Sequence, residues 1–220
     1  MLAKWIGLFS VIDFISAGML VSVVAMNSLK RIDGCIKAYA ANSWLLASMM
    51  GASAVYLSEP HLYAAAFYTI AVKCIGIPYV LKRVAKELKV TRETDPYVSG
   101  PVSTMASFAL VGIVYSALSR GISVTGFAQN SLEVAVSIIL VSLFTMMIRG
   151  KAITQVIGLL FMENGLFLAG FSLTRGMPTL VELGVLFDLF MGVLILGVFL
   201  SQIKKTFVSV DLDRLTNLKG

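Results

Sequence analysis

Seven long stretches of the chain are almost entirely apolar, and short polar segments separate them. Each stretch is close to the ~20 residues that an α-helix needs to cross a bilayer. Helices of this length in a soluble protein would show a polar face, and these mostly do not. The pattern therefore predicts an all-α integral membrane protein with seven transmembrane helices. The predicted helices cover about residues 5–26, 38–57, 61–82, 101–119, 131–149, 152–173 and 179–201.

The amino-acid composition agrees with this pattern. Of the 220 residues, 58% are hydrophobic and only 14% are charged, whereas a soluble domain usually carries about 25% charged residues. The chain is long enough for about seven spans and little else, so we expect no soluble domain. The first stretch, Trp5 to Met26, is too long for the apolar region of a signal peptide, and we expect it to be retained as a span.

The basic residues are concentrated in the segments between the apolar stretches. The net charge of +6 could indicate a nucleic-acid partner, but lysine and arginine in the loops of a membrane protein report its orientation. If the N-terminus lies outside, 14 of the 18 Lys and Arg residues fall in inner segments, three fall in outer segments and Lys73 lies within a helix. This distribution predicts an outer N-terminus, a cytoplasmic C-terminus and no nucleic-acid binding.

The longest loop, about residues 83–100, follows the third apolar stretch, and the sequence LKRVAKELK runs into it. Its apolar residues share one side and lysines line the rest, so we expect an amphipathic cytoplasmic continuation of the third helix. Its lysines suit contact with anionic lipid headgroups, and docking of a partner subunit is the alternative.

Four ionisable residues, on four different predicted helices, lie deep in the apolar stretches. An Asp, Lys or Arg at the centre of a transmembrane helix costs roughly 2.5–3.5 kcal/mol on insertion scales. At 1.5 Å of rise per residue, each of the four lies about 12–18 Å from one end of its predicted helix, near the midplane of a ~30 Å hydrocarbon core. If the helices pack together, the four side chains form a lateral row through which protons can move. These residues are Asp13, Lys73, Glu163 and Asp188.

The same residues also have structural interpretations. Glu163 could be a neutral acid that joins two helices, and we expect Asn164 to act as such a link. Lys73 could simply pair with Asp13. Two further acids, Glu133 and Glu182, lie close to the outer ends of their predicted helices. They are either solvated or the points where protons enter and leave the row.

Pro78 lies five residues after Lys73 in the third stretch. A proline removes a backbone hydrogen bond and clashes one turn back, near Cys74. The resulting disruption either makes room for water beside Lys73 or is an ordinary packing kink. Cys35, assigned here to a loop, and Cys74 lack metal-ligand spacing, and no nucleophile–base pair is evident. We therefore expect no metal, no cofactor and no catalytic residue in this chain.

Three segments near the C-terminus resemble the K subunit of complex I. They are IGLLFMENG (157–165), DLFMGVLIL (188–196) and VDLDRLTNLKG (210–220). The likeness covers about residues 131–220 and implies a three-helix, complex I-like region after a four-helix region at residues 1–130. It also implies proton-carrying roles for Glu163 and Asp188. The family's glutamate falls on Leu160, so Glu163 is displaced by three residues, which is about one helical turn on nearly the same face.

The whole chain resembles the hydrogenase-4 component E family of membrane subunits, which occur in formate hydrogenlyase and other group 4 hydrogenases. The resemblance implies a multi-pass protein of a prokaryotic inner membrane that lies beside antiporter-like and quinone-site-like subunits and surrounding lipids. A peripheral hydrogenase arm would hold the nickel–iron and iron–sulfur centres of this oxidoreductase complex.

The implied function is ion transport, namely proton translocation along the midplane charges. The alternatives are a structural adaptor that conducts no ions and a subunit of a multisubunit sodium/proton antiporter. An independent solute transporter ranks lower, because transporter sites usually have Gly/Pro-interrupted helices in paired positions of two halves. Here only Pro78 interrupts a predicted helix.

Overall fold

The computed structural model describes residues 2–57, 60–87, 97–121 and 127–174, together with Gly184, Met191, Gly192 and Gly197. The regular elements in these ranges are helices, as predicted, and the first six apolar stretches each lie within helical structure. The seventh, 179–201, falls outside the described residues except for those four positions. The elements are α1 (Leu2–Ser28), α2 (Ile32–Leu57), α3 (Pro60–Thr69), the π-helix η1 (Ile70–Gly76), α4 (Ile77–Glu87), α5 (Gly100–Gly121), α6 (Phe127–Ile148) and α7 (Ala152–Thr174).

Five helical segments in the described part of the chain are long and apolar enough to cross a membrane. They are Val11–Ser28, Leu62–Glu87, Gly100–Ser119, Asn130–Ile148 and Ala152–Leu173. The chain is therefore an all-helical membrane protein, while the number of seven spans and the orientation of the termini stay predictions.

The helix α2 is not among these five segments, although its predicted span 38–57 is helical throughout. It packs against α1, α3, η1, α4 and α7. Its polar residues Asn42, Ser43 and Ser53 are all buried. Because neighbouring helices cover the face that carries these residues, α2 holds polar side chains that a face turned to lipid could not hold cheaply.

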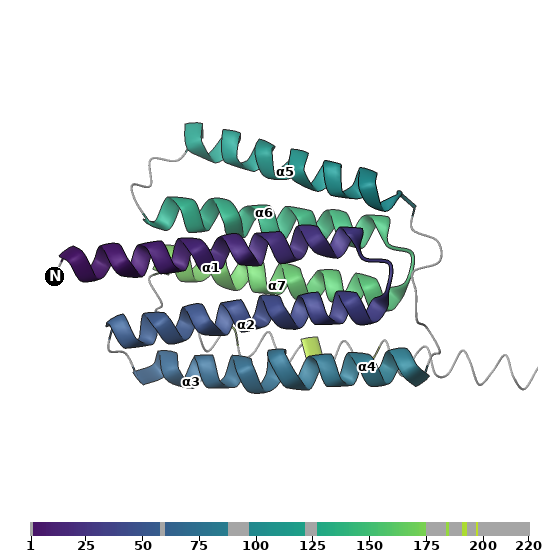
Figure 1. The fold of residues 1–220 in the computed structure, drawn as a ribbon, viewed down its shortest axis with the longest axis horizontal. Helices are drawn as coiled ribbons and strands as arrows, with labels where there is room; N and C mark the ends of the chain where they lie inside the picture. Colours follow the sequence, from purple (N-terminus) through teal and green to yellow (C-terminus); the bar gives the residue numbers. More distant parts are fainter. Residues whose placement is uncertain are drawn as a thin grey trace, which may run out of the picture.

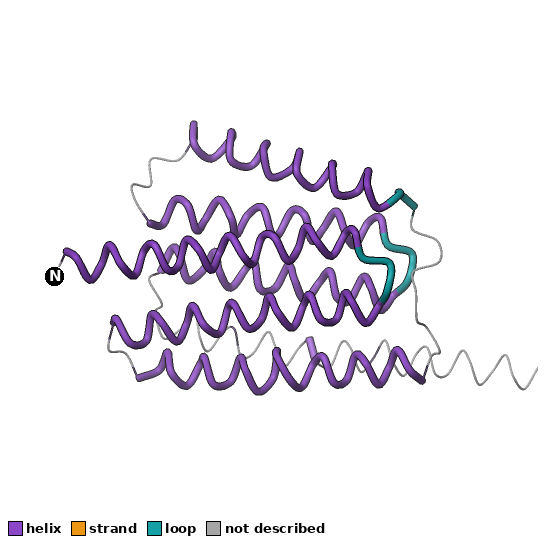
Figure 2. Tube along the Cα trace, in the orientation of Figure 1, coloured by secondary structure: helices purple, strands orange, loops and turns teal. Residues whose placement is uncertain are grey.

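The helices lie side by side and alternate in direction along the chain (Figure 1). The helix α5 lies at one edge of the bundle and α3, η1 and α4 form the opposite edge, as the tube in Figure 2 also shows. The ends of α1, α4 and α6 and the starts of α2, α5 and α7 therefore meet at one end of the bundle.

Two glycines of α7 allow α6 and α7 to approach closely. A Cβ atom on Gly158 would lie 2.8 Å from Cγ of Met146, and one on Gly165 would lie 2.8 Å from Cγ2 of Ile138. With 3.6 residues per turn, residue 163 lies on the other side of the helix from these glycines. The tight packing against α6 thus turns Glu163 toward α2 and η1.

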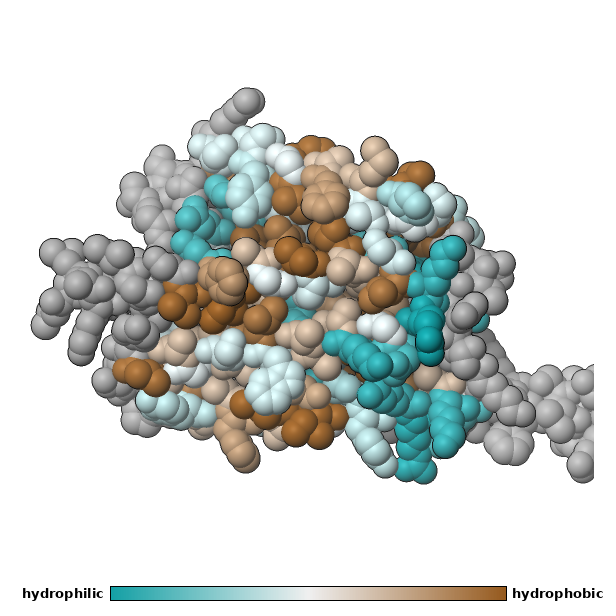
Figure 3. All heavy atoms as spheres, viewed as in Figure 1, coloured by the Kyte–Doolittle hydropathy of each residue, from teal (hydrophilic) through white to brown (hydrophobic). Residues whose placement is uncertain are grey.

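Exposed basic residues gather at the end of the bundle where α1 is followed by α2. The helix α4 continues the third apolar stretch as far as Glu87, which confirms the predicted helical continuation up to that residue. On α4, Val84 is buried, whereas Lys82, Arg83 and Lys86 are exposed. Hydrophilic side chains cover this part of the surface in the view of Figure 3. This arrangement agrees with the predicted cytoplasmic face. The other exposed basic residues at this end are Lys30, Arg31 and Lys37.

Candidate functional site: a buried lysine–carboxylate network

Lys73 lies in the π-helix η1. The backbone N–H of Ile77 donates to the carbonyl of Val72 five residues earlier, and Pro78 follows directly. Proline cannot donate to a carbonyl of the preceding turn, so Pro78 weakens the regular α-helical hydrogen bonding just before it. The disruption predicted near Cys74 is therefore present as a π-helix, a conformation that is frequent at functional sites.

The ammonium group of Lys73 is paired with a carboxylate inside the bundle. Its Nζ lies 2.9 Å from Oε1 of Glu163, and the two side chains are only 2% and 4% exposed. Lys73 also donates to Oδ1 of Asn164 at 3.1 Å and lies 6.0 Å from the centre of the Phe167 ring. The sequence predicted similar depth for the lysine and the glutamate, and the structure brings them into direct contact.

Asn164 extends the network from α7 to α2 and α1. Its Nδ2 donates to Oδ1 of Asn42 at 2.9 Å and to Oγ of Ser43 at 3.1 Å. Nδ2 of Asn42 then donates to Oγ of Ser22 at 2.8 Å. The predicted linking role of Asn164 thus has a geometric basis. Asn42, Ser43 and Ser22 were not predicted, although an Asn-Ser pair within an apolar stretch was a usable signal.

The paired charges of Lys73 and Glu163 can share one proton without a change in the net charge of the pair. Lys73 and Glu163 together carry no net charge when both are ionised or when the proton has moved from the lysine to the carboxylate. Either state avoids an uncompensated charge in a low-dielectric interior, which is the costly arrangement. A further proton gives the pair a net positive charge, which nearby titratable groups sense strongly in such an environment.

Asp13 lies elsewhere in the structure. Its Oδ2 accepts a hydrogen bond from Nδ2 of Asn130 on α6 at 3.4 Å, and its Oδ1 is buried with no hydrogen-bond partner among the described residues. Lys73 pairs with Glu163, so the structural interpretation in which Lys73 pairs with Asp13 was wrong. Helix rotation decides such pairing, and depth alone does not.

Glu133 of α6 is 5% exposed. The interpretation that it is merely solvated was therefore wrong, because α6 packs against α1, α5 and α7. Asp13 of α1 and Glu133 of α6 both lie near Tyr115 of α5, and these three helices pack against one another. The roles predicted for Asp13 and Glu133 stay predictions.

Two predicted acids, Asp188 and Glu182, lie outside the described residues. Cys35 is in the first turn of α2 and buried, so its assignment to a loop was wrong, and Cys74 is buried in η1 as its position in a span predicted. Within the described ranges, no three His, Cys, Asp or Glu side chains come together in a way that could hold a metal ion.

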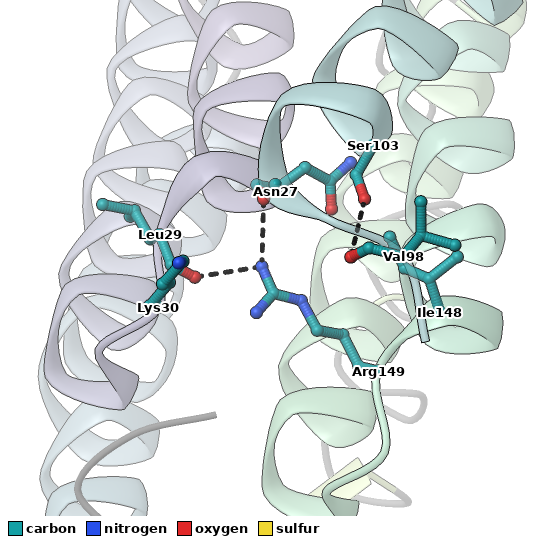
Figure 4. A pocket seen from close by; sticks show the side chains of 8 residues that line it. Asn27, Leu29, Lys30, Val98, Ser103, Ile148 and Arg149 are labelled. Carbon is teal, nitrogen blue, oxygen red and sulfur yellow. Dashed lines mark hydrogen bonds between the residues drawn. The ribbon is translucent and has the colours of Figure 1, made fainter. Parts of the chain in front are cut away.

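A second buried cation, Arg149, joins the ends of α1 and α6 (Figure 4). It is 3% exposed, and its Nη2 donates to the carbonyls of Met26 at 2.9 Å and Leu29 at 3.0 Å. From the sequence, Arg149 was expected only to be one of the basic residues in an inner turn. Asn27 adds a side-chain link beside it, because its Nδ2 donates to Ser107 and its Oδ1 accepts from Thr145.

The fold and these buried groups define the class of the molecule, an all-helical, multi-pass membrane protein with ionisable side chains inside its helix bundle. The chain is a homologue of hydrogenase-4 component E. It is 24% identical to that protein of Escherichia coli K12 over 216 residues, which are 96% of this chain and 98% of the relative.

A second relative is the uncharacterized protein Rv0085 of Mycobacterium tuberculosis. It is 26% identical over 210 residues, which are 94% of this chain and 96% of the relative. No model of a protein family matches the chain. No solved structure matches it either.

Proposed function

We propose that the chain is a membrane-arm subunit of a group 4 hydrogenase or formate hydrogenlyase-type complex, and that Lys73 and Glu163 form part of a lateral proton path. The observation that carries the proposal is a 2.9 Å contact between two titratable groups that are both almost fully buried. Ionisable residues at this depth are costly and usually functional. The similarity to hydrogenase-4 component E along nearly the whole chain supports the choice of complex.

In this proposal Glu163 and Lys73 exchange a proton across their hydrogen bond. Asn164, anchored on Asn42, holds the lysine beside the carboxylate so that the transfer distance stays short. The arrival of an extra proton makes the net charge of the Lys73–Glu163 pair more positive. This favours the release of a proton to the next acid, because like charges repel strongly at low dielectric. In the same proposal Asp188 and Asp13 are further stations of the path, and Glu133 and Glu182 are the points of exchange with the outer side.

The driving reaction belongs to partner subunits. A peripheral hydrogenase arm with nickel–iron and iron–sulfur centres would supply the redox energy, and antiporter-like and quinone-site-like membrane subunits would continue the path. The chain itself would hold no cofactor and would lie among lipids of a prokaryotic inner membrane, with its N-terminus outside and its C-terminus inside.

A structural adaptor is the second candidate, and a specific observation favours it. Lys73 and Asn164 make hydrogen bonds that connect η1, α7 and α2, as expected if the network only holds helices together. The two functions differ in what they predict for a charge-neutral replacement. The adaptor requires only packing, whereas proton transfer requires groups that titrate.

The deciding experiment measures redox-driven proton uptake in inverted vesicles that contain the whole complex. We expect Glu163→Gln to lower uptake by about tenfold or more, because the amide cannot exchange protons, while the complex still assembles. Asp188→Asn tests the next station. Glu87→Gln is the matched control, because Glu87 makes only an exposed pair with Arg83.

The outcomes separate the candidates. Normal uptake by assembled Glu163→Gln complexes would refute the proton path, and loss of assembly would favour the adaptor. Mass spectrometry of the subunits that co-purify in mild detergent distinguishes a hydrogenase complex from a multisubunit sodium/proton antiporter, since only the hydrogenase complex contains a nickel–iron subunit.

A further inference from the structure

A small pocket lies where α1 ends, α5 begins and α6 ends (Figure 4). Its volume of about 10 Å³ is about the least that a cavity needs to admit one water molecule or one oxygen atom of similar size. Lys30 is exposed and lines the pocket, so the mouth reaches the surface of the bundle. The lining residues are Asn27, Leu29, Lys30, Val98, Gly100, Ser103, Ile148 and Arg149.

Arg149 presents an unused donor in this place. Its Nη2 donates to the carbonyls of Met26, Asn27 and Leu29, but its buried Nε has no hydrogen-bond partner in the described part of the chain. The side chain is 97% buried, given its 3% exposure. A buried donor without a partner costs about 1–3 kcal/mol, and more when it is charged, so an acceptor that reaches Nε is strongly favoured.

The described groups around the pocket carry a net positive charge. The carbonyl ends of α1 and α6 contribute together roughly one unit of negative charge, and the N-terminal end of α5 contributes about half a unit of positive charge. Arg149 and Lys30 add two full positive charges. No Asp or Glu is among the residues that line the pocket. An anion therefore complements the site better than a neutral acceptor such as water.

We propose that this pocket binds a phosphate group, with one of its oxygens seated in the cavity beside Nε of Arg149 and its remaining charge paired with Lys30. A guanidinium group and a helix N-terminus are both favourable partners for phosphate oxygens. The pocket admits one oxygen atom, so the rest of the group lies at the mouth. The site is at the basic end of the bundle, where a phospholipid headgroup or a free phosphate can reach it. The inference does not depend on the proton path.

The test uses the full chain, purified in mild detergent and stripped of lipid, and follows its thermal unfolding. Phosphatidylglycerol and inorganic phosphate are titrated in separate arms, and phosphatidylcholine controls for bulk lipid. We expect one anionic probe to raise Tm in a saturable way. Arg149→Gln should weaken the apparent affinity by about tenfold or more, and Lys30→Gln should weaken it by about fivefold.

Lys86→Gln is the matched control, because Lys86 is an exposed lysine of α4 and does not line the pocket. If Arg149→Gln fails to fold, the comparison of Lys30→Gln with Lys86→Gln decides. The anionic probe that binds more tightly identifies a lipid or a free phosphate as the source. Equal losses in Lys30→Gln and Lys86→Gln, or no saturable effect of either anion, would overturn the proposal and leave the pocket with a water molecule.

Discussion

The described part of the bundle contains two buried cations, Lys73 and Arg149, and their charges are compensated in different ways. Lys73 meets the carboxylate of Glu163 and the amide of Asn164. Among the residues that the structure describes, Arg149 donates its hydrogen bonds to backbone carbonyls at the end of α1. The first cation therefore has a partner that can gain or lose a proton, and the second has partners that cannot.

This difference separates two physical tasks. A lysine beside a carboxylate can change its charge state, because burial and the neighbouring charge oppose each other in setting it. An arginine stays charged at any physiological pH, so beside fixed dipoles it acts as a permanent tie between α1 and α6. The network around Lys73 therefore contains a neighbouring group that can itself titrate, whereas the network around Arg149 joins α1 and α6 at one end of the bundle through backbone carbonyls.

The largest expected effect follows from removal of Lys73. Breaking a buried ion pair by removing one partner typically costs about 3–5 kcal/mol, so Lys73→Met should unfold at a clearly lower temperature in detergent. The double variant Lys73→Met/Glu163→Leu should regain most of the stability, because apolar replacement of a whole pair is often neutral. A double variant as unstable as the single one would contradict this account of the pair.

Truncation of Arg149 should come next in size. Arg149→Gln removes charge-assisted hydrogen bonds to the carbonyls of α1, each worth about 1.5–3 kcal/mol, and we expect a loss of about 2–3 kcal/mol in thermal or chemical unfolding. Arg149→Lys should lose less, because the charge remains. If the two variants were equally stable, the permanent charge would not be what ties α1 to α6.

Asn42 should show a smaller effect that is coupled to the lysine network. Asn42→Ala removes the acceptor for Asn164 and should cost about 1–2 kcal/mol. A double-mutant cycle with Asn164→Ala should give a coupling of about 0.5 kcal/mol or more, because the two amides are in contact. The matching cycle of Asn42→Ala with Arg149→Gln should be additive, since these side chains share no bond.

The smallest effect is expected at an exposed pair. Lys37 lies 2.9 Å from Asp33, and its hydrogen bond lowers the pKa of Asp33 below the ordinary value. The small stabilisation is therefore present above the ordinary pKa and is lost as pH falls through the lowered pKa. Asp33→Asn should cost about 0.3–0.5 kcal/mol at pH 7 in unfolding measurements and nothing at low pH. A large loss of stability in Asp33→Asn would mean that exposed and buried ion pairs contribute similarly to the stability of this protein.

Much of the fold could be predicted from the sequence, because long apolar stretches leave few alternatives to membrane helices. Counting residues from the helix ends also placed Lys73 and Glu163 at similar depths in the membrane. It could not show that they touch, since contact depends on how each helix is rotated about its axis. That rotation is set by packing, such as the close approach of α7 to α6 at Gly158 and Gly165.

Arg149 shows a different reason for an incomplete prediction. Counting of basic residues treats every lysine and arginine near a helix end alike, yet Lys30 is exposed and Arg149 is buried. The burial arises because α1, α5 and α6 pack against one another, which no local pattern reports. The burial of Asn42 and Ser43 likewise depends on the helices that pack against one face of α2, although the Asn-Ser pair itself was visible in the sequence.

The π-helix at Ile70–Gly76 also affects how this protein should be compared with its relatives. A π-helical turn contains one more residue than the regular α-helix that would replace it. A relative with a regular helix there is therefore expected to align only with a one-residue gap inside a transmembrane segment, a place where gaps are normally avoided. An ungapped alignment would pair Lys73 or the residues of α4 with the wrong positions, and a search for equivalent lysines should allow that single-residue shift.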